Sequence, residues 1–135
     1  MMSDKGKKQE NNSKSCLYLL PERVSAKQLA EVLPSSEGIN YITSRDIEIW
    51  TDFNCLELTL KSGVLTLEEL SAEEMGADDD SLLKKLGMVQ IYACDYEESA
   101  GGEVRQVMSI LKTAFGGILA SDTDDFTPFL EAEEL

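Results

Sequence analysis

The chain has 135 residues, of which 42% are hydrophobic, so it is long enough for one domain with a true core but leaves little room for two. Its 26 acidic and 12 basic residues give a net charge of −14, which argues against nucleic acids and anionic membranes, because binding either requires Lys and Arg. The absence of histidine excludes the commonest general base and histidine metal ligation.

The first 14 residues differ from the rest in charge. They contain four lysines and two acidic residues, which gives a net charge of +2. Because the whole chain carries −14, residues 15–135 carry −16. We expect a disordered polar tail over 1–14, a single α+β domain over 15–130 and a frayed acidic C-terminus over 131–135. The three cysteines include no CxxC pair, and no secretory signal or membrane-length apolar run is found, so we expect a cytoplasmic protein.

A strand and a capped helix open the predicted domain. The apolar run Cys16–Leu20 is typical of a short buried strand. Ser25 and Gln28 have the spacing of a capping box, and the apolar residues that follow recur on one helical face. The sequence therefore predicts a helix that begins after Ser25 and ends at Pro34.

An antiparallel hairpin is predicted next. The segment 39–43 is β-branched and is expected to be a strand. Apolar and polar residues alternate over Ile47–Trp50 and again over 56–60, on both sides of a short polar turn. One face of this hairpin is apolar and must be covered, whereas the other is polar.

The second half of the chain predicts two more helices. Asp78–Asp80 precede the segment 81–86 and Gly87 follows it, a distribution that suits the dipole and the C-terminus of a short helix. The segment 64–77 has mixed signals, with a further capping box at Ser71 and Glu74. In chain order we then expect a strand over 88–94 and an acidic loop over 95–102. The longest helix is expected over 103–115 and a closing strand over 118–120.

These elements predict an α+β fold. We expect a two-layer sandwich in which a mainly antiparallel sheet carries two principal helices on one face. The strand–helix–strand units suit ferredoxin-like βαβ crossovers, an analogy of architecture that implies no function.

Catalytic and cofactor motifs are missing from the sequence. It contains no GxGxxG, Walker A or GxSxG pattern, and its acidic pairs are too numerous to specify a glycosidase site. The clusters Asp78–Asp80 and Asp122–Asp125 lack the ligand spacing of a calcium loop. We therefore expect no enzyme, cofactor or metal. A carboxylate-based enzyme or divalent-metal protein is the less favoured alternative to the two binding hypotheses given below.

The remaining candidate is a protein-binding face. If Ile47 and Ile49 face the core, the alternation places Trp50, the only tryptophan, on the acidic outward face. An aromatic ring among carboxylates is typical of a hot spot for a cationic protein. The acidic segments after two later strands are expected to extend this face. The predicted partner-binding residues are Glu48, Trp50, Asp52, Phe53, Glu57, Asp95, Glu97, Glu98, Asp122, Asp124 and Asp125.

These observations predict a small acidic, non-enzymatic binding module that docks on a basic protein, as an inhibitor or immunity-type protein. In charge and size it resembles the immunity proteins of bacterial toxin systems, which offer carboxylates in place of substrate phosphates. The alternative is a homo-oligomeric regulatory or scaffold domain of ferredoxin-like type, in which Trp50 and Phe53 form a symmetric homodimer interface.

Overall fold

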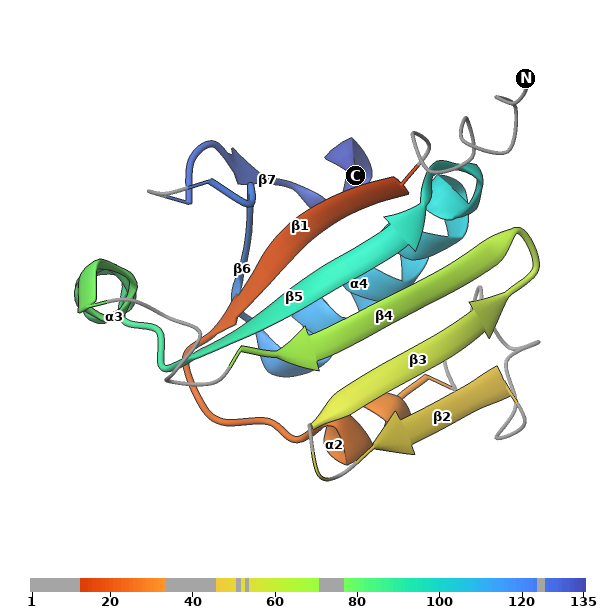
Figure 1. Cartoon of the computed structure of the whole chain (residues 1–135), viewed down its shortest axis with the longest axis horizontal. Coiled ribbons are helices and arrows are strands. Elements are labelled where there is room, and N and C mark those ends of the chain that lie inside the picture. Colours follow the sequence, from red (N-terminus) through yellow and green to blue (C-terminus); the bar gives the residue numbers. More distant parts are fainter. Residues whose placement is uncertain (1–12, 34–45, 51, 53, 71–76, 124–125) are drawn as a thin grey trace, which may run out of the picture.

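Seven strands in the described part of the chain form one antiparallel sheet, with the order β2-β3-β4-β5-β1-β6-β7 (Figure 1). The structure, a computed structural model, describes residues 13–33, 46–50, 52, 54–70, 77–123 and 126–135. The strands are β1 (Ser13–Leu20), β2 (Ile47–Trp50), β3 (Cys55–Leu60), β4 (Gly63–Glu69), β5 (Gln90–Glu97), β6 (Ile118–Ala120) and β7 (Phe129–Leu130).

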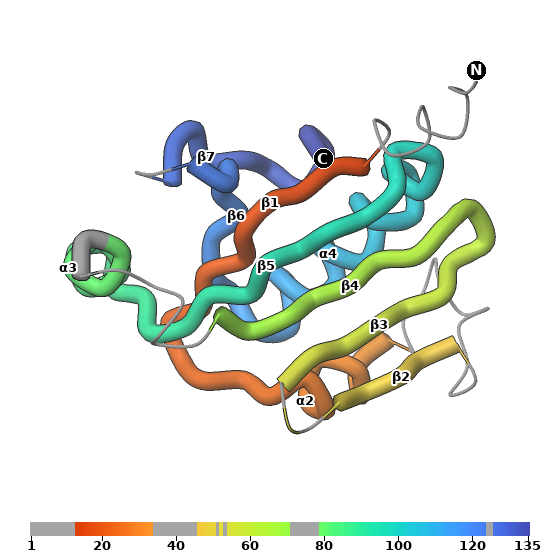
Figure 2. Tube along the Cα trace, in the orientation of Figure 1, coloured from red at the N-terminus to blue at the C-terminus, as the bar shows by residue number. Residues whose placement is uncertain are grey.

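Two helices, α2 and α4, cover one face of this sheet, so the predicted two-layer α+β sandwich is confirmed (Figure 1). A third helix, α3, lies at the end of the sheet where β1 ends and β5 begins (Figure 2). None of the helices in the described residues has the length and apolar character needed to cross a membrane. The helices are α2 (Ala26–Glu31), α3 (Ala77–Leu86) and α4 (Gly101–Phe115), with 3-10 turns η2 (Glu98–Ala100) and η3 (Ala132–Glu134).

Helix α2 begins at the capping box that its sequence predicts. Ser25 Oγ accepts a hydrogen bond from the Gln28 backbone N–H at 3.1 Å, and Gln28 Oε1 accepts one from the Ser25 N–H at 2.9 Å. These two bonds satisfy donors that a helix N-terminus otherwise leaves unpaired. Leu29 then points into the core and is fully buried.

Helix α4 connects two parallel strands that are not neighbours. Strands β5 and β6 are both antiparallel to β1, which lies between them, so β5–α4–β6 is a βαβ unit split by one strand. The first strand–helix–strand unit, β1–α2–β2, differs, because three strands (β5, β4 and β3) lie between β1 and β2. Only the second unit therefore has the spacing of a ferredoxin-like crossover.

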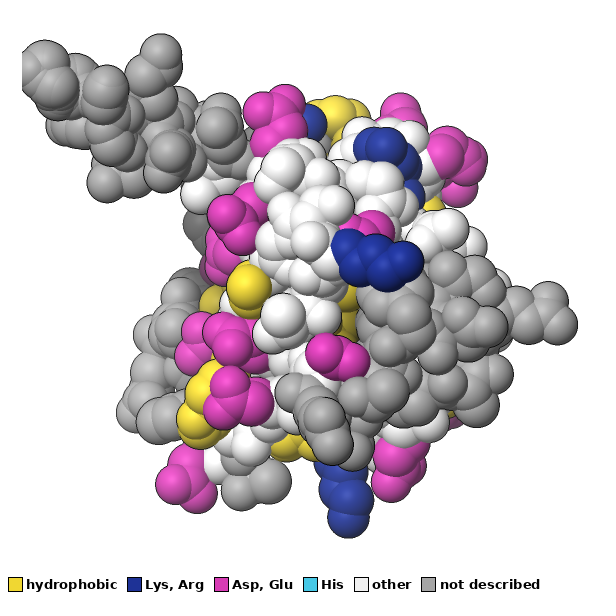
Figure 3. Space-filling view, turned by 90° about the vertical axis from the view of Figure 1, so that its right-hand side faces the viewer, with side chains coloured by type: hydrophobic (Ala, Val, Ile, Leu, Met, Phe, Trp, Pro, Cys, Tyr) yellow, Lys and Arg dark blue, Asp and Glu magenta, His cyan; other side chains and the backbone are white. Residues whose placement is uncertain are grey.

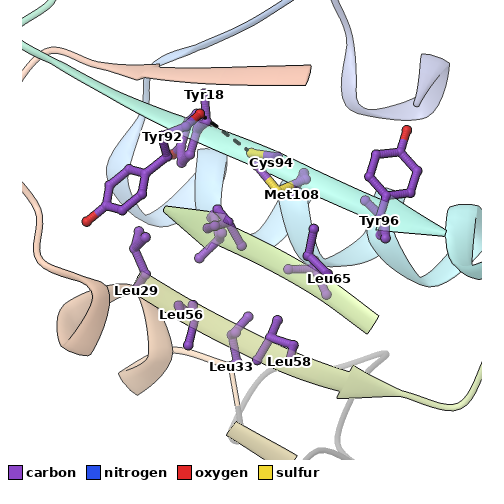
Figure 4. Packing of buried hydrophobic residues seen from close by; sticks show 14 of the residues in the cluster. Tyr18, Leu29, Leu33, Leu56, Leu58, Leu65, Tyr92, Cys94, Tyr96 and Met108 are labelled. Atoms are coloured by element: carbon purple, nitrogen blue, oxygen red, sulfur yellow. Dashed lines mark hydrogen bonds between the residues drawn. The ribbon is translucent and has the colours of Figure 1, made fainter. Parts of the chain in front are cut away.

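The main core lies between the sheet and helices α2 and α4 (Figure 4). Tyr18 and Tyr92 are its largest fully buried side chains. The Tyr18 hydroxyl donates to the Gly116 carbonyl oxygen at 2.7 Å, so the ring can be buried without an unsatisfied polar group. Cys94 Sγ makes a weaker contact, 3.8 Å from the carbonyl oxygen of Tyr92.

Several boundaries differ from the sequence-based expectation. Strand β1 begins at Ser13 rather than Cys16, and the segment of mixed signals contains the strand β4. The acidic loop expected at 95–102 is wrong, because β5 continues to Glu97 and α4 begins at Gly101. Buried Tyr96 lies between two exposed acids, so this stretch alternates as a strand does.

The C-terminal segment forms a helical turn that contacts α4. Residues 132–134 form η3, and Leu135 is only 6% exposed. The Arg105 guanidinium on α4 donates to the Leu135 carbonyl oxygen at 2.6 Å. The expected strand at 39–43 and the capping box at Ser71 and Glu74 lie outside the described residues.

Candidate functional site

The two faces of the sheet differ in composition. On β3, Leu56 and Leu58 are fully buried in the core with α2 and α4, so Glu57 between them lies on the opposite face. The strand register extends this assignment to the neighbouring strands. We call the part of the second face that lies on β2–β5 the open face, formed by Glu48, Trp50, Cys55, Glu57, Thr59, Val64, Thr66, Glu68, Asp95 and Glu97.

Helix α3 covers a different part of this second face. Its Leu83 is buried in a smaller apolar cluster with Leu17, Leu19 and Ile91 of β1 and β5. In Figure 1 no labelled helix lies in front of β2, β3 or β4. The open face is therefore the part of the sheet that the described helices leave uncovered.

A row of acidic residues crosses the open face at right angles to the strands. Glu48 on β2 lies opposite Glu57 on β3, which in turn lies opposite Thr66 on β4. Thr66 lies opposite Asp95 on β5. Adjacent strands are about 4.8 Å apart, so each position in this row is a direct cross-strand neighbour of the next. Like charges directly opposite each other on antiparallel strands are generally destabilising, so stability does not favour a Glu48–Glu57 pair.

Asp95 and Asp122 come together at the other end of this row. Burial raises the pKa of the Asp95 carboxyl above its ordinary value, and the negative charge of Asp122 raises it further. Asp122 lies two residues beyond β6, whose Ala120 pairs with Leu17 of β1. The sheet thus brings together two acids that are far apart in the chain.

Trp50 lies on the open face, at the end of the edge strand β2. The residue is 38% exposed, and its pairing with Cys55 places it on the face opposite Leu56. It lies opposite Cys55, whose thiol is buried. Burial raises the pKa of Cys55, and the nearby charges of Glu68 and Glu57 raise it further. Trp50 therefore borders the acidic surface with an apolar ring.

Two predicted binding residues lie beside the open face rather than on it. Asp52 is exposed between β2 and β3, and Glu98 is exposed at the start of η2. Glu97 is on the open face, but its carboxylate accepts a hydrogen bond from the Val64 N–H at 3.1 Å and so contributes to the β4–β5 pairing. The predicted residues Phe53, Asp124 and Asp125 lie outside the described residues.

Glu68 is an acidic residue of the open face that sequence reasoning missed. It is exposed on β4, directly opposite Cys55. The sequence does contain the alternation that indicates a strand, because Leu65 and Leu67, which are buried, alternate with Thr66 and Glu68. It was overlooked because β4 itself was not predicted.

A second carboxylate interaction fixes the turn between β3 and β4. Glu103 of α4 accepts hydrogen bonds from the Lys61 N–H at 3.0 Å and the Ser62 N–H at 2.8 Å. Ser99 Oγ donates to the Ser62 carbonyl oxygen at 2.7 Å. Figure 3 views the molecule from this side, and acidic side chains are more frequent there than Lys and Arg. These contacts attach the end of the open face to α4.

A surface cavity next to α4 offers few charged groups. It has a volume of about 450 Å³ and lies between α4 and η3, where Arg105 and Glu133 contribute the charged groups. Within the described ranges, no group of three or more Cys, Asp or Glu side chains is placed to hold a metal ion. The uncovered sheet face is therefore the candidate site with the most distinctive chemistry.

Comparison with protein-family models, with curated proteins and with solved structures finds no match to this chain. Its function must accordingly be argued from the residues and their geometry.

Proposed function

We propose that this chain is a non-enzymatic binding module that docks on a basic protein partner through the open face. The observation that carries the proposal is the acidic row formed by Glu48, Glu57 and Asp95 across the part of the sheet that the described helices leave uncovered. No Lys or Arg is among the described residues that form this face. A cationic surface would neutralise charges that the fold itself leaves close together.

Trp50 supplies the apolar part of such an interface. A half-exposed indole at the border of a carboxylate surface can pack against the aliphatic stem of a Lys or Arg and attract its charged head. Tryptophan is also among the residues that contribute most to binding energy at protein interfaces. The combination supports a specific protein contact over general solubility.

The net charge supports a fast, salt-sensitive association. The acidic field of the chain would steer a basic partner toward the open face, and salt would screen this attraction. A partner that must bind phosphate would be inhibited by this docking, because the carboxylates would occupy its cationic groups. This supports an inhibitor or immunity-type role.

A capture experiment tests the docking proposal. We would compare the immobilised wild type with a face variant, Glu48→Gln, Glu57→Gln and Asp95→Asn, and with a control variant, Glu22→Gln, Glu31→Gln and Glu133→Gln. The control removes the same charge from exposed positions off the open face. We expect basic proteins to bind the wild type and control, to be released by salt, and to be lost with the face variant.

Two results would contradict the proposal. One is equal capture by all three chains, because the open face would then play no part. The other is a captured set without basic proteins, because charge complementarity would then be irrelevant.

The position of β2 favours homodimerisation as a second candidate. This strand is at the edge of the described sheet, and both Ile49 and Trp50 are more than a third exposed. Edge strands of two copies can pair and bury such residues. Sedimentation across a range of concentrations would show a dimer that Ile49→Lys abolishes, whereas a monomer at all concentrations would refute this candidate.

A further inference from the structure

Two cysteine side chains meet on the central strands of the sheet. Cys16 of β1 lies directly opposite Cys94 of β5 in the antiparallel register, and both residues belong to the main core. All three cysteines of the described chain are free. Directly opposite residues of antiparallel strands have Cα atoms about 4.5–5.5 Å apart, within the range of about 4.4–6.8 Å that a disulfide spans. The backbone positions of the two cysteines therefore suit a cross-strand disulfide, although both thiols are free.

A surface cavity reaches one of these two residues. It has a volume of about 210 Å³, and Cys16 forms part of its wall with Lys14, Tyr96 and Glu134. Cys94 is not part of this wall, and both cysteines are buried, with exposures of 1% for Cys16 and 0% for Cys94. One water molecule takes roughly 30 Å³ of liquid volume, so the cavity accommodates a small oxidant such as hydrogen peroxide.

The two thiols differ in their readiness to ionise. Interaction with the Cys94 side chain lowers the pKa of Cys16, although burial and the charges of Asp95 and Asp122 oppose this effect. The same interaction raises the pKa of Cys94, and the burial of Cys94 raises it further. The thiolate is the reactive form of cysteine, so Cys16 is the residue that an oxidant attacks first.

We propose that Cys16 and Cys94 form a peroxide-sensitive thiol pair that closes an intrachain disulfide between β1 and β5. In the first step the Cys16 thiolate attacks hydrogen peroxide, the O–O bond breaks, and sulfenic acid and hydroxide form. In the second step Cys94 attacks the Cys16 sulfur, and water leaves as the S–S bond forms. Overall, two thiols and one peroxide give one disulfide and two waters. This site is independent of the open face.

Cys55 provides an internal control. It lies on the other face of the sheet, opposite Trp50, and has no cysteine across from it in the register. If oxidation requires two cysteines opposite each other, Cys55 should stay reduced, whereas oxidation of cysteines regardless of position would also modify Cys55. The variant Cys55→Ala keeps the thiol pair intact and removes every alternative partner.

The test treats the folded protein with hydrogen peroxide, then unfolds it in an alkylating reagent and maps the modified peptides by mass spectrometry. We expect a peptide pair linked through Cys16 and Cys94 in the wild type and in Cys55→Ala, with Cys55 alkylated in the wild type. In Cys94→Ala, a dione reagent should trap Cys16 as the sulfenic acid. Mapping of the wild type requires no core substitution, so a variant that fails to fold leaves the test intact.

Three outcomes would overturn the proposal. The first is a linkage that includes Cys55, and the second is a linkage between two chains. The third is that all three thiols of the folded chain stay free at a peroxide dose that links Cys16 and Cys94 when the chain is unfolded in urea.

Discussion

The Tyr92 hydroxyl donates a hydrogen bond to the carbonyl oxygen of Val24 at 2.5 Å, which attaches the centre of the sheet to the start of α2. The same hydroxyl accepts a hydrogen bond from the Asn54 side-chain amide at 2.8 Å. Asn54 also accepts from the Ala26 N–H at 2.7 Å, and Gln90 accepts from the Val24 N–H at 2.8 Å. The network satisfies polar groups that this end of the core would otherwise bury unpaired.

Replacing Tyr92 by phenylalanine should therefore destabilise the fold by about 1–3 kcal/mol. The change leaves the Val24 carbonyl without its donor and removes one acceptor of the Asn54 amide. Tyr18→Phe is the comparison, because it removes a single bond, to Gly116, and should cost about 1 kcal/mol. Urea denaturation measures both free energies. Equal costs would show that the network adds nothing beyond one bond.

Gly117 should tolerate no side chain. Its φ is +96°, and a Cβ atom there would lie 2.4 Å from the backbone oxygen of Leu19. Gly87 has a similar φ of +76°, but no atom lies within 4 Å of its Cβ position. We expect Gly87→Ala to cost about 1 kcal/mol and Gly117→Ala at least about 3 kcal/mol, because only the latter forces two backbone segments apart. Thermal unfolding of the two variants would contradict this argument if their midpoints were the same.

Asp95 should make stability depend on pH. Its pKa is raised in the folded chain, so the folded state holds the proton more tightly than the unfolded state does. The resulting destabilisation is absent at low pH, where both states are protonated, and develops as pH rises through the unfolded and then the folded pKa. Asp95→Asn should therefore raise the melting temperature at pH 7, by about 2 °C for this exposed group, and should not raise it near pH 3.

An equal effect of Asp95→Asn at both pH values would indicate that ionisation is not the cause. Asp122→Asn is the matching experiment. It removes the charge that raises the pKa of Asp95, and it should shift the pH dependence of stability toward lower pH.

Glu57→Lys should separate stability from binding. The substitution places a lysine directly opposite Glu48 and replaces a repulsive cross-strand pair by an attractive one. We expect a gain of about 0.5 kcal/mol in unfolding free energy together with loss of basic partners in the capture experiment. Glu31→Lys makes the same charge change on α2 and should leave capture unchanged. Loss of stability in Glu57→Lys would contradict the repulsion argument.

Local patterns along the chain predicted much of the fold. The capping box of Ser25 and Gln28 predicted α2, and the apolar stripe ending near Phe115 predicted α4. The alternation over Ile47–Trp50 placed Trp50 on the outward face. Each of these depends on interactions within a few residues, for which sequence spacing is sufficient information.

The tertiary structure alone decided which distant residues meet. The acidic row requires Glu57, Thr66 and Asp95 to share one register across three strands, and no local pattern specifies that register. The contact between Cys16 and Cys94 likewise exists only because β1 is placed between β5 and β6. Strand order follows from burying every apolar face at once, a property of the whole chain rather than of any segment.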